Sequence, residues 1–193
     1  MKNVLILNAH HYYPFSEGKL NAALIAKADA FFQAKGYQTR VVNTQDEFDV
    51  ETELENHQWA DIVFLQSPIN WMGMTWSFKK YMDEVYTAGM GGALCHGDGR
   101  YQDNPKANYG KGGTLNNTQY MMSLTLNAPA ESFADVADFF EGKSVDDLVF
   151  PMHMNFKFFG MQALPTFVCY DVMKNADIDS DFARFEKHLN ENF

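Results

Sequence analysis

The feature that most restricts the fold of this chain is an alternation of short apolar segments with longer segments of helical periodicity. Residues 4–8 and 61–66 are short runs rich in β-branched and aliphatic side chains, as expected of strands buried on both faces. Residues 18–35 and 78–86 instead place apolar side chains three or four positions apart, as amphipathic helices do. Because strands that alternate with helices are joined by crossovers, the sequence predicts a parallel sheet covered by helices.

The rest of the chain follows the same alternation. Five strands are predicted, at residues 4–8, 39–43, 61–66, 120–125 and 166–170. Helices are predicted at residues 18–35, 49–58, 78–86 and 133–140, with a last one around Phe182, Phe185 and Leu189. This arrangement favours the strand order 2-1-3-4-5, in which ligands bind at the carboxyl ends of the strands. The candidate site therefore lies in the loops after the first, third and fourth strands.

Length and charge restrict the classes of function. A chain of 193 residues fits one domain of ordinary size, covering residues 1–193. The formal net charge of -10 opposes nucleic acid and anionic lipid, so neither is an expected partner. The apolar run at residues 4–7 is too short for a signal-peptide core, and no run approaches the roughly 18 residues of a membrane span. With two widely separated cysteines, Cys95 and Cys169, we expect a cytoplasmic protein.

Two further features point to a ligand or a partner. Aromatic residues make up 15% of the chain, more than a small core needs, so some of them should line a pocket or an interface. Eight of the 13 glycines fall within residues 89–113, which predicts a long loop. Because long loops in compact domains are usually functional, we expect this one to contribute to the site.

The segment after the first predicted strand is a candidate phosphate site. It leads into a helix, and the free N–H groups and positive dipole end of a helix N-terminus hold phosphate well. The candidate residues are Ser16, Glu17, Gly18, Lys19, Leu20, Asn21, Ala22 and Ala23. The alternative is that Ser16 only caps the helix. Neither the glycine triplet of dinucleotide-binding Rossmann folds nor a P-loop is present, so a nucleotide would be bound by another pattern.

The segment after the third predicted strand contains two tryptophans and two methionines. Such flat, polarisable side chains at the edge of a sheet suit the stacking of an isoalloxazine ring. Trp71, beside Asn70 and Gly73, is the better pocket candidate, whereas Trp76 is expected to pack under its own helix. After the fourth strand, residues 125–129 offer backbone N–H groups and an amide where the pyrimidine edge of a flavin needs donors.

The six histidines have no metal-binding spacing, so no metal is expected. His57 and His188 are predicted to be solvated helix positions, and His96 lies in the long loop. His153, in an apolar setting, is predicted to be a core histidine with satisfied hydrogen bonds rather than a proton donor. No nucleophile elbow or Cys-His-Asn set supports covalent hydrolase chemistry.

Several segments together resemble one known family. They are residues 66–73 (QSPINWMG), 79–83 (KKYMD), 124–129 (LTLNAP) and 160–167 (GMQALPTF). In these segments, and over nearly the whole chain, the sequence resembles the modulator of drug activity B family of flavodoxin-like NAD(P)H:quinone oxidoreductases. The resemblance implies an α/β fold, a flavodoxin-like three-layer sandwich around a five-stranded parallel sheet in the order 2-1-3-4-5.

The resemblance also implies FAD as cofactor, NADPH or NADH as electron donor and a quinone as acceptor. Residues 16–23 would hold the FAD phosphates and ribityl chain. The residues expected around the flavin ring are Ile69, Asn70, Trp71, Met72, Tyr109, Thr125, Leu126, Asn127 and Ala128. Tyr109 is the candidate catalytic residue, because it could shape the acceptor space or donate a hydrogen bond. The family acts as homodimers, with the site at the subunit boundary.

The departures from the family pattern are local. Leu126 stands where a tryptophan is familiar, Asn70 where another aromatic residue is common, and one extra residue appears near residues 90–92. All three lie near the expected quinone pocket, so they affect the choice of acceptor more than FAD binding.

Two rival functions share this fold. An azo or nitro reductase would use the same hydride chemistry on an acceptor of different shape. A flavodoxin-type electron carrier would expose the flavin edge, which the long loop at residues 89–113 argues against. For the quinone reductase, one flavin face covered by protein predicts that donor and acceptor use the other face in turn, in a two-electron ping-pong reaction.

Overall fold

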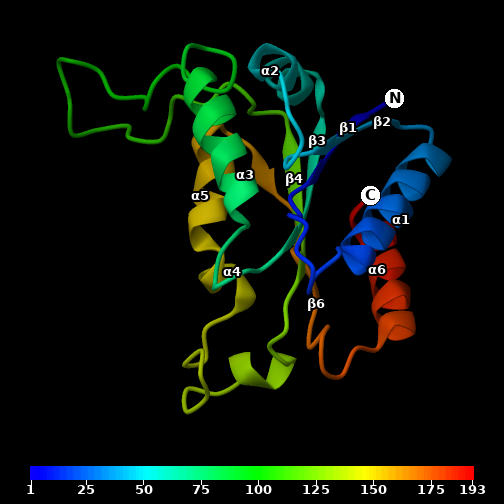
Figure 1. Ribbon diagram of the computed structural model, residues 1–193. Coiled ribbons are helices and arrows are strands. Elements are labelled where there is room, and N and C mark those ends of the chain that lie inside the picture. The colour runs from blue at the N-terminus through cyan, green and yellow to red at the C-terminus, as the bar shows by residue number, and fades with distance from the viewer.

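The computed structural model describes residues 1–193, and its strands and helices alternate along the chain (Figure 1). The strands are β1 (Asn3–Asn8), β2 (Gln38–Asn43), β3 (Ile62–Pro68), β4 (Gln119–Thr125), β5 (Gln162–Ala163) and β6 (Phe167–Cys169). The helices are α1 (Lys19–Ala34), α2 (Val50–Trp59), α3 (Trp76–Tyr81), the π-helical η1 (Met82–Tyr86), the 3-10 helix η2 (Ala130–Phe133), α4 (Val145–Leu148), α5 (Phe150–Phe158) and α6 (Ile178–Asn192).

All strands of the sheet run parallel, in the order β2-β1-β3-β4-β5, with β6 also paired to β4. Tyr120 at the start of β4 lies opposite Ala163, and Thr125 at its end lies opposite Cys169. The fifth position of the sheet is therefore shared by two short strands. The break between them contains Pro165, which has no N–H to donate to a ladder. The predicted order 2-1-3-4-5 is confirmed.

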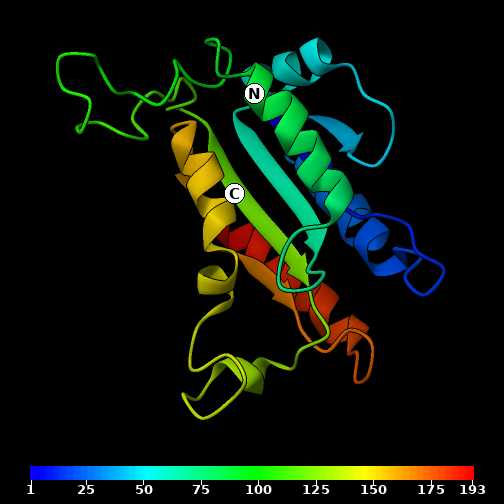
Figure 2. The same cartoon turned by 60° about the vertical axis from the view of Figure 1, so that its left-hand side comes forward.

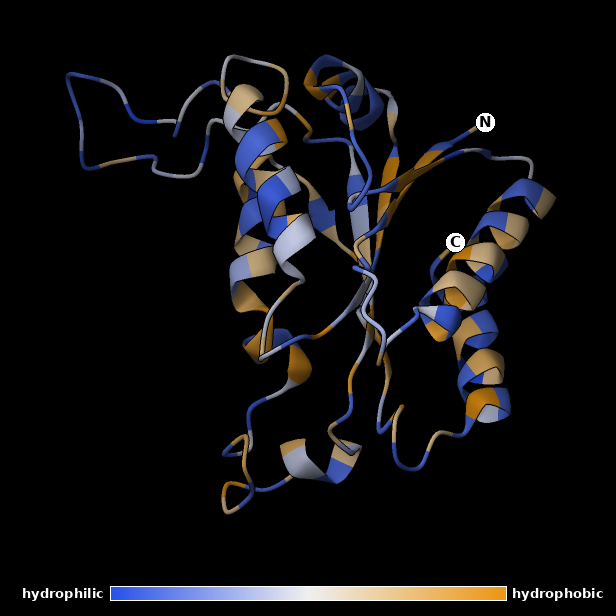
Figure 3. Cartoon of the chain, viewed as in Figure 1, coloured by the Kyte–Doolittle hydropathy of each residue, from blue (hydrophilic) through white to orange (hydrophobic).

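The sheet separates two hydrophobic cores, because successive strand residues point to opposite faces. Leu5 and Leu7 face the core that α3, η1 and α5 cover, whereas Val4 and Ile6 face the core under α1 and α6. Figure 2 shows α3 and α5 on the same face of the sheet, and Figure 3 shows hydrophobic residues concentrated on its strands. None of the helices combines the length and apolar character needed to cross a membrane.

The helix predicted at residues 133–140 is not formed. η2 ends at Phe133, and the chain then folds back so that the rings of Phe133 and Phe140 stack with centroids 4.0 Å apart. Asp135 accepts a hydrogen bond from the Ala137 N–H, a local turn that competes with a helix. The helices of this crossover are instead α4 and α5, which the sequence analysis missed although Pro151 occupies a position in the first turn of α5 where proline is favoured.

Three predictions of whether a side chain is buried or exposed are wrong. His57 is fully buried rather than solvated, because α2 packs against η1, and its Nδ1 lies 2.9 Å from the Glu53 carbonyl oxygen. His188 is half-buried, with its Nε2 at 2.9 Å from the Pro165 carbonyl oxygen. Trp76 does not pack under its helix; it is 58% exposed. Helical periodicity places a residue on a face but does not say which neighbouring element covers that face.

Candidate functional site

Three loops meet at the carboxyl edge of the sheet, as the sequence predicts. The Ile69 N–H donates to the Thr125 carbonyl over 2.8 Å, which joins the loops after β3 and β4. The Thr75 hydroxyl donates to the Ala9 carbonyl over 2.6 Å, which joins the β3 loop to the β1 loop. Because parallel strands end at the same edge, residues separated by more than 50 positions become neighbours there.

The N-terminus of α1 is free to bind an anion. The N-cap residue is Gly18, and no side chain caps this helix end, so the alternative that Ser16 is only a cap is wrong. The N–H groups of Lys19, Leu20 and Asn21 donate to no group of the chain. Unpaired N–H groups at the positive end of a 16-residue helix are able to bind an anion.

The backbone before α1 is shaped by His10. Gly18 has a φ of +80°, and a Cβ at this position would lie 2.6 Å from the His10 ring, so the loop requires glycine here. The Nε2 of His10 lies 3.1 Å from the Ser16 carbonyl oxygen. Burial lowers the pKa of His10, which keeps its ring uncharged near neutral pH.

Two buried polar atoms in the same loop region have no hydrogen-bond partner. They are Nδ1 of His11 and Oδ1 of Asn21. Asn21 is held in place because its Nδ2 donates to Oδ1 of Asn8 over 2.6 Å. Buried polar atoms in folded proteins nearly always have partners, so these two are available to a polar ligand such as a sugar or phosphate. The residues present therefore fit a nucleotide cofactor at this edge.

The loop after β3 is a tight, strained turn with Trp71 at its tip. Asn70 and Gly73 exchange backbone hydrogen bonds of 2.8 and 3.0 Å, while Trp71 and Met72 between them have φ of +47° and +65°. This is the backbone of a type I′ turn, which ordinarily favours glycine or asparagine. The turn leaves the Trp71 side chain 99% exposed, and the N–H groups of Trp71 and Met72 donate to no group of the chain.

The loop after β4 completes one cavity, called the ring cavity here, of about 350 Å³. It is lined by Ile69, Trp71, Met72, Leu126, Asn127, Ala128, Ser132, Phe133, Phe139, Phe140 and Leu148. The Leu126 N–H donates to the Cys169 carbonyl oxygen over 3.0 Å, whereas the N–H groups of Asn127 and Ala128 have no partner in the chain. A mostly apolar cavity bordered by free amide donors suits a fused heteroaromatic ring.

A larger open groove of about 870 Å³, called the aromatic groove here, lies on the other side of the Trp71 turn. Its lining includes Tyr13 and Phe15, whose rings stack with centroids 5.1 Å apart, together with Trp76. Ile69 and Trp71 line both the ring cavity and the aromatic groove. The two spaces therefore share a wall, and the loop that leads into α1 contributes to the groove.

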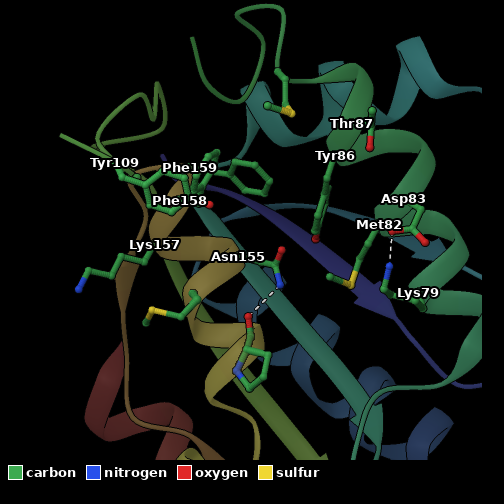
Figure 4. Close-up of a pocket in the computed structure, with 14 residues that line it drawn as sticks. Lys79, Met82, Asp83, Tyr86, Thr87, Tyr109, Asn155, Lys157, Phe158 and Phe159 are labelled. Atoms are coloured by element: carbon green, nitrogen blue, oxygen red, sulfur yellow. Dashed lines mark hydrogen bonds and ion pairs between the residues drawn. The ribbon is translucent and has the colours of Figure 1, made fainter. Parts of the chain in front are cut away.

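Tyr109 does not lie beside the other predicted residues within one chain. It belongs to the loop that precedes β4, at the amino edge of the sheet, whereas the Trp71 turn follows the carboxyl end of β3 (Figure 1). Its ring is 69% exposed and packs on Phe158 with centroids 5.8 Å apart. There it borders an α3–α5 groove of about 620 Å³, where Tyr86, Met82 and Asn155 face the same space (Figure 4).

Five aromatic side chains that line the cavities were not predicted from the sequence. Tyr13 and Phe15 line the aromatic groove and Phe133, Phe139 and Phe140 line the ring cavity, and the excess of aromatic residues was their only signal. For His153, the predicted hydrogen-bond partners are confirmed, but the side chain is half-buried rather than in the core. Both ring nitrogens of His153 have partners: the Tyr120 hydroxyl at 2.7 Å and Asp146 at 3.1 Å. No three His, Cys, Asp or Glu side chains are grouped as a metal site would require.

Comparison with known proteins places this site in a family. A family model described as a flavodoxin-like fold matches residues 2–192. An NADPH:quinone oxidoreductase, MdaB, of Haemophilus influenzae is 41% identical over 191 residues, which cover 99% of this chain and 99% of that protein.

Solved structures show the same fold. A candidate quinone reductase from Klebsiella pneumoniae matches with a TM-score of 0.77 at 22% identity, over 98% of this chain and 84% of that one. General stress protein 14 of Treponema denticola, in complex with FMN, matches with a TM-score of 0.67 at 19% identity, over 99% of this chain and 97% of that one. The chain therefore belongs to the flavodoxin-like family and, within it, to the oxidoreductases of the modulator of drug activity B group.

Proposed function

We propose that this protein is an FAD-dependent NAD(P)H:quinone oxidoreductase. The observation that carries the proposal is the ring cavity between the Trp71 turn and the β4 loop, at the same edge as the uncapped N-terminus of α1. The relative from Haemophilus influenzae is named for this activity. Neither cavity presents a nucleophile with a paired base, which suits chemistry carried by a cofactor rather than by a covalent side-chain intermediate.

Different residues around the ring cavity and the aromatic groove would bind different parts of a flavin. The free N–H groups at the start of α1 would bind phosphate, and His11 and Asn21 would meet polar atoms nearby. The N–H groups of Trp71, Met72, Asn127 and Ala128 would donate to the heteroatoms of the ring. A flavin, when bound, accepts a hydride from a reduced nicotinamide and passes two electrons to a quinone.

The choice of FAD over FMN rests on the aromatic groove. A second nucleotide half needs an aromatic shelf and space next to the phosphate site, and the stacked Tyr13 and Phe15 beside a groove of about 870 Å³ offer both. The Treponema relative in the comparison holds FMN instead. Release of the cofactor from purified protein, followed by its chromatographic identification, tests this choice: FAD supports it, and FMN alone contradicts it.

The order of the reaction follows from the walls of the ring cavity. With a bound ring held between the Trp71 turn and the β4 loop and one of its faces covered by protein, the reduced nicotinamide and the quinone would have to use the remaining face in turn. Initial rates measured for NADPH against quinone should then give parallel double-reciprocal lines. Intersecting lines would show that donor and acceptor bind together and would contradict this order.

The same assay tests two other acceptor classes, azo dyes and nitroaromatic compounds, and the alternative role of an electron carrier. An azo dye and a nitroaromatic compound run beside a quinone would show which acceptor has the highest kcat/KM. A flavodoxin-type carrier is disfavoured because Phe133 and Phe140 wall the ring cavity rather than leaving its edge open. Failure of every two-electron acceptor to turn over with NADPH or NADH would favour the carrier.

Replacing Trp71 with alanine should weaken flavin binding roughly tenfold and lower quinone turnover with it. The side chain is 99% exposed, so its removal should cost the fold almost nothing, and any loss reflects the missing stacking surface. Flavin titration followed by fluorescence would measure the change. Met173→Ala is the control: Met173 is 67% exposed and lines neither the ring cavity nor the aromatic groove, so flavin affinity should not change. Unchanged flavin affinity in Trp71→Ala would contradict this role.

The position of Tyr109 leads to a second prediction, that the protein is a symmetric homodimer in which Tyr109 completes the partner's site. Tyr109 lies at the sheet edge opposite the Trp71 turn of its own chain, so it can join a flavin site only from another copy. Light scattering should give twice the chain mass of 22.0 kDa. A mass of one chain with flavin bound would contradict the dimer.

Mixing two inactive variants tests the exchange of Tyr109 directly. In a heterodimer of Trp71→Ala and Tyr109→Ala chains, one site would contain both substitutions and the other would contain neither. Statistical mixing should therefore restore about a quarter of the wild-type activity. No recovery on mixing, with both variants folded and dimeric, would show that Tyr109 acts within its own chain or not at all.

A further inference from the structure

A row of polar side chains, called the polar row here, crosses the sheet next to its carboxyl edge. It consists of Asn8 of β1, Gln66 of β3 and Ser123 of β4. Asn8 is the register partner of Gln66, and Gln66 is the register partner of Ser123. The residue two positions earlier in each of these strands belongs to the core under α1 and α6. Because side chains alternate along a strand, the polar row points to the same face.

Asn8 connects the polar row to the first turn of α1. Its Oδ1 accepts a hydrogen bond from Nδ2 of Asn21 over 2.6 Å and another from the His10 N–H over 3.2 Å. Its Nδ2 donates to Oδ1 of Asn43 over 2.8 Å. Asn21 lies in the same turn of α1 as the N–H groups that donate to no group of the chain. The polar row therefore lies beneath the candidate phosphate site.

The polar row contains hydrogen-bonding atoms that are buried and unpaired. Gln66 and Ser123 are both 0% exposed, and Asn21 is 3% exposed. Nε2 and Oε1 of Gln66, Oγ of Ser123 and Oδ1 of Asn21 have no partner in the chain. Burial of an unpaired polar group costs free energy, so a sheet that needed only to be stable would have apolar side chains here. The four atoms therefore indicate a polar partner that is not part of the chain.

These atoms suit one buried water molecule. An N–H of the Gln66 amide would donate to the water, and the water would donate to Oδ1 of Asn21 and Oγ of Ser123. That arrangement gives the water about three hydrogen bonds, the usual number for a buried site. The oxygen of Asn21 has a second lone pair, so it can also accept a hydrogen bond from a hydroxyl group of a ligand. Gln66 and the first turn of α1 would then be joined.

We propose that Gln66 is a positioning residue for the phosphate of the cofactor, and that it acts through this water on the first turn of α1. The inference rests on the proposed function, because it takes the N-terminus of α1 as the phosphate site. The Asn21 side chain is then held from Asn8 and from Gln66, so the free N–H groups of α1 keep a fixed direction. If Asn8 alone holds it, binding of phosphate must also offset the entropy of ordering that turn.

Replacing Gln66 with methionine tests this role, because methionine has a similar volume but no N–H to donate. The affinities for FMN, FAD and riboflavin can be measured by quenching of flavin fluorescence. The affinities for FMN and FAD should fall roughly tenfold, the effect of losing about one hydrogen bond. The affinity for riboflavin should not change, because riboflavin has the same ring without a phosphate.

Phe64→Leu is the matched control. Phe64 lies in the same strand and points to the same face as Gln66, in the core under α1 and α6. Its replacement disturbs that core but leaves the polar row complete, so the ratio of FMN affinity to riboflavin affinity should equal that of wild type. Three results would overturn the proposal: unchanged FMN affinity in Gln66→Met, an equal loss for riboflavin, or the same change of ratio in Phe64→Leu.

A double-mutant cycle in the flavin-free protein separates this inference from the proposed function. Urea unfolding gives the stabilities of wild type, Gln66→Met, Asn21→Ala and the double variant. A link through the water predicts effects that are not additive, because either substitution alone removes it. If the protein binds no flavin, the proposed function fails, yet non-additive effects still support the link between Gln66 and α1. Additive effects would reject the link, even in an active quinone reductase.

Discussion

Replacing Gly113 with alanine is expected to lower the free energy of unfolding by about 3 kcal/mol. Gly113 ends the long loop, where the chain crosses the C-terminal end of α5. A Cβ there would lie 2.2 Å from the Phe159 carbonyl carbon and 2.4 Å from the Gly160 nitrogen. Both are backbone atoms, so no side chain can rotate away, and either α5 or the start of β4 must shift. The Leu115 N–H bond to the Phe159 carbonyl, at 2.9 Å, would be strained by that shift.

Denaturant unfolding of the variant beside Gly91→Ala measures this effect. Gly91 lies in the same loop, but a Cβ there would meet nothing nearer than the Ala88 carbonyl oxygen at 3.8 Å. Gly91→Ala should therefore stay within about 0.5 kcal/mol of wild type. Equal stability of the two variants would show that the loop and α5 do not cross as closely as described. Because α5 also borders the groove at Tyr109, a shift there should also weaken the dimer that we propose.

Acid is expected to lower the free energy of unfolding of this protein, because His57 is buried in its neutral form. Burial lowers the pKa of His57 to about 4, and the hydrogen bond between its Nδ1 and the Glu53 carbonyl offsets only part of this effect. In the unfolded chain the pKa returns to about 6.5. Between these two values the unfolded state binds a proton that the folded state does not. The free energy of unfolding therefore falls as pH drops from about 6.5 to about 4, by roughly 3 kcal/mol in total.

The variant His57→Phe keeps an aromatic ring beside Tyr86 and removes the titrating group. Urea unfolding at about pH 7 and at about pH 4.5 measures how much stability each protein loses on acidification. The loss of free energy of unfolding between these two pH values should be smaller for His57→Phe than for wild type, by roughly 2–3 kcal/mol. His96→Gln, at an exposed position, should behave like wild type. The comparison with wild type is needed because burial also lowers the pKa of His10, which adds acid sensitivity of the same sign. Identical pH dependence in wild type and His57→Phe would contradict the burial of a neutral His57.

A strand that is buried on both faces needs apolar side chains wherever it lies in the chain, and such strands were therefore predictable. β1 and β3 are buried on both faces, so residues 4–7 and 62–65 are apolar without a break, and the ends of both strands match the prediction to within two residues. The site loops followed from topology, since parallel strands must end at one edge. In contrast, the type I′ turn was not predictable, because Trp71 and Met72 both have positive φ, against the local preference of such residues.

By itself, the sequence determined the alternating architecture, the strand order and the three loops that build the site. Tertiary structure alone decided three other matters: that residues 133–140 fold back as a loop, that His57 is buried, and that Tyr109 lies at the opposite edge of the sheet from Trp71. The physical reason is the same in each case. A spacing of seven residues between Phe133 and Phe140 is satisfied both by two turns of helix and by a loop that stacks the two rings. Local pattern states which side chains must be covered, and only contacts between distant segments decide what covers them.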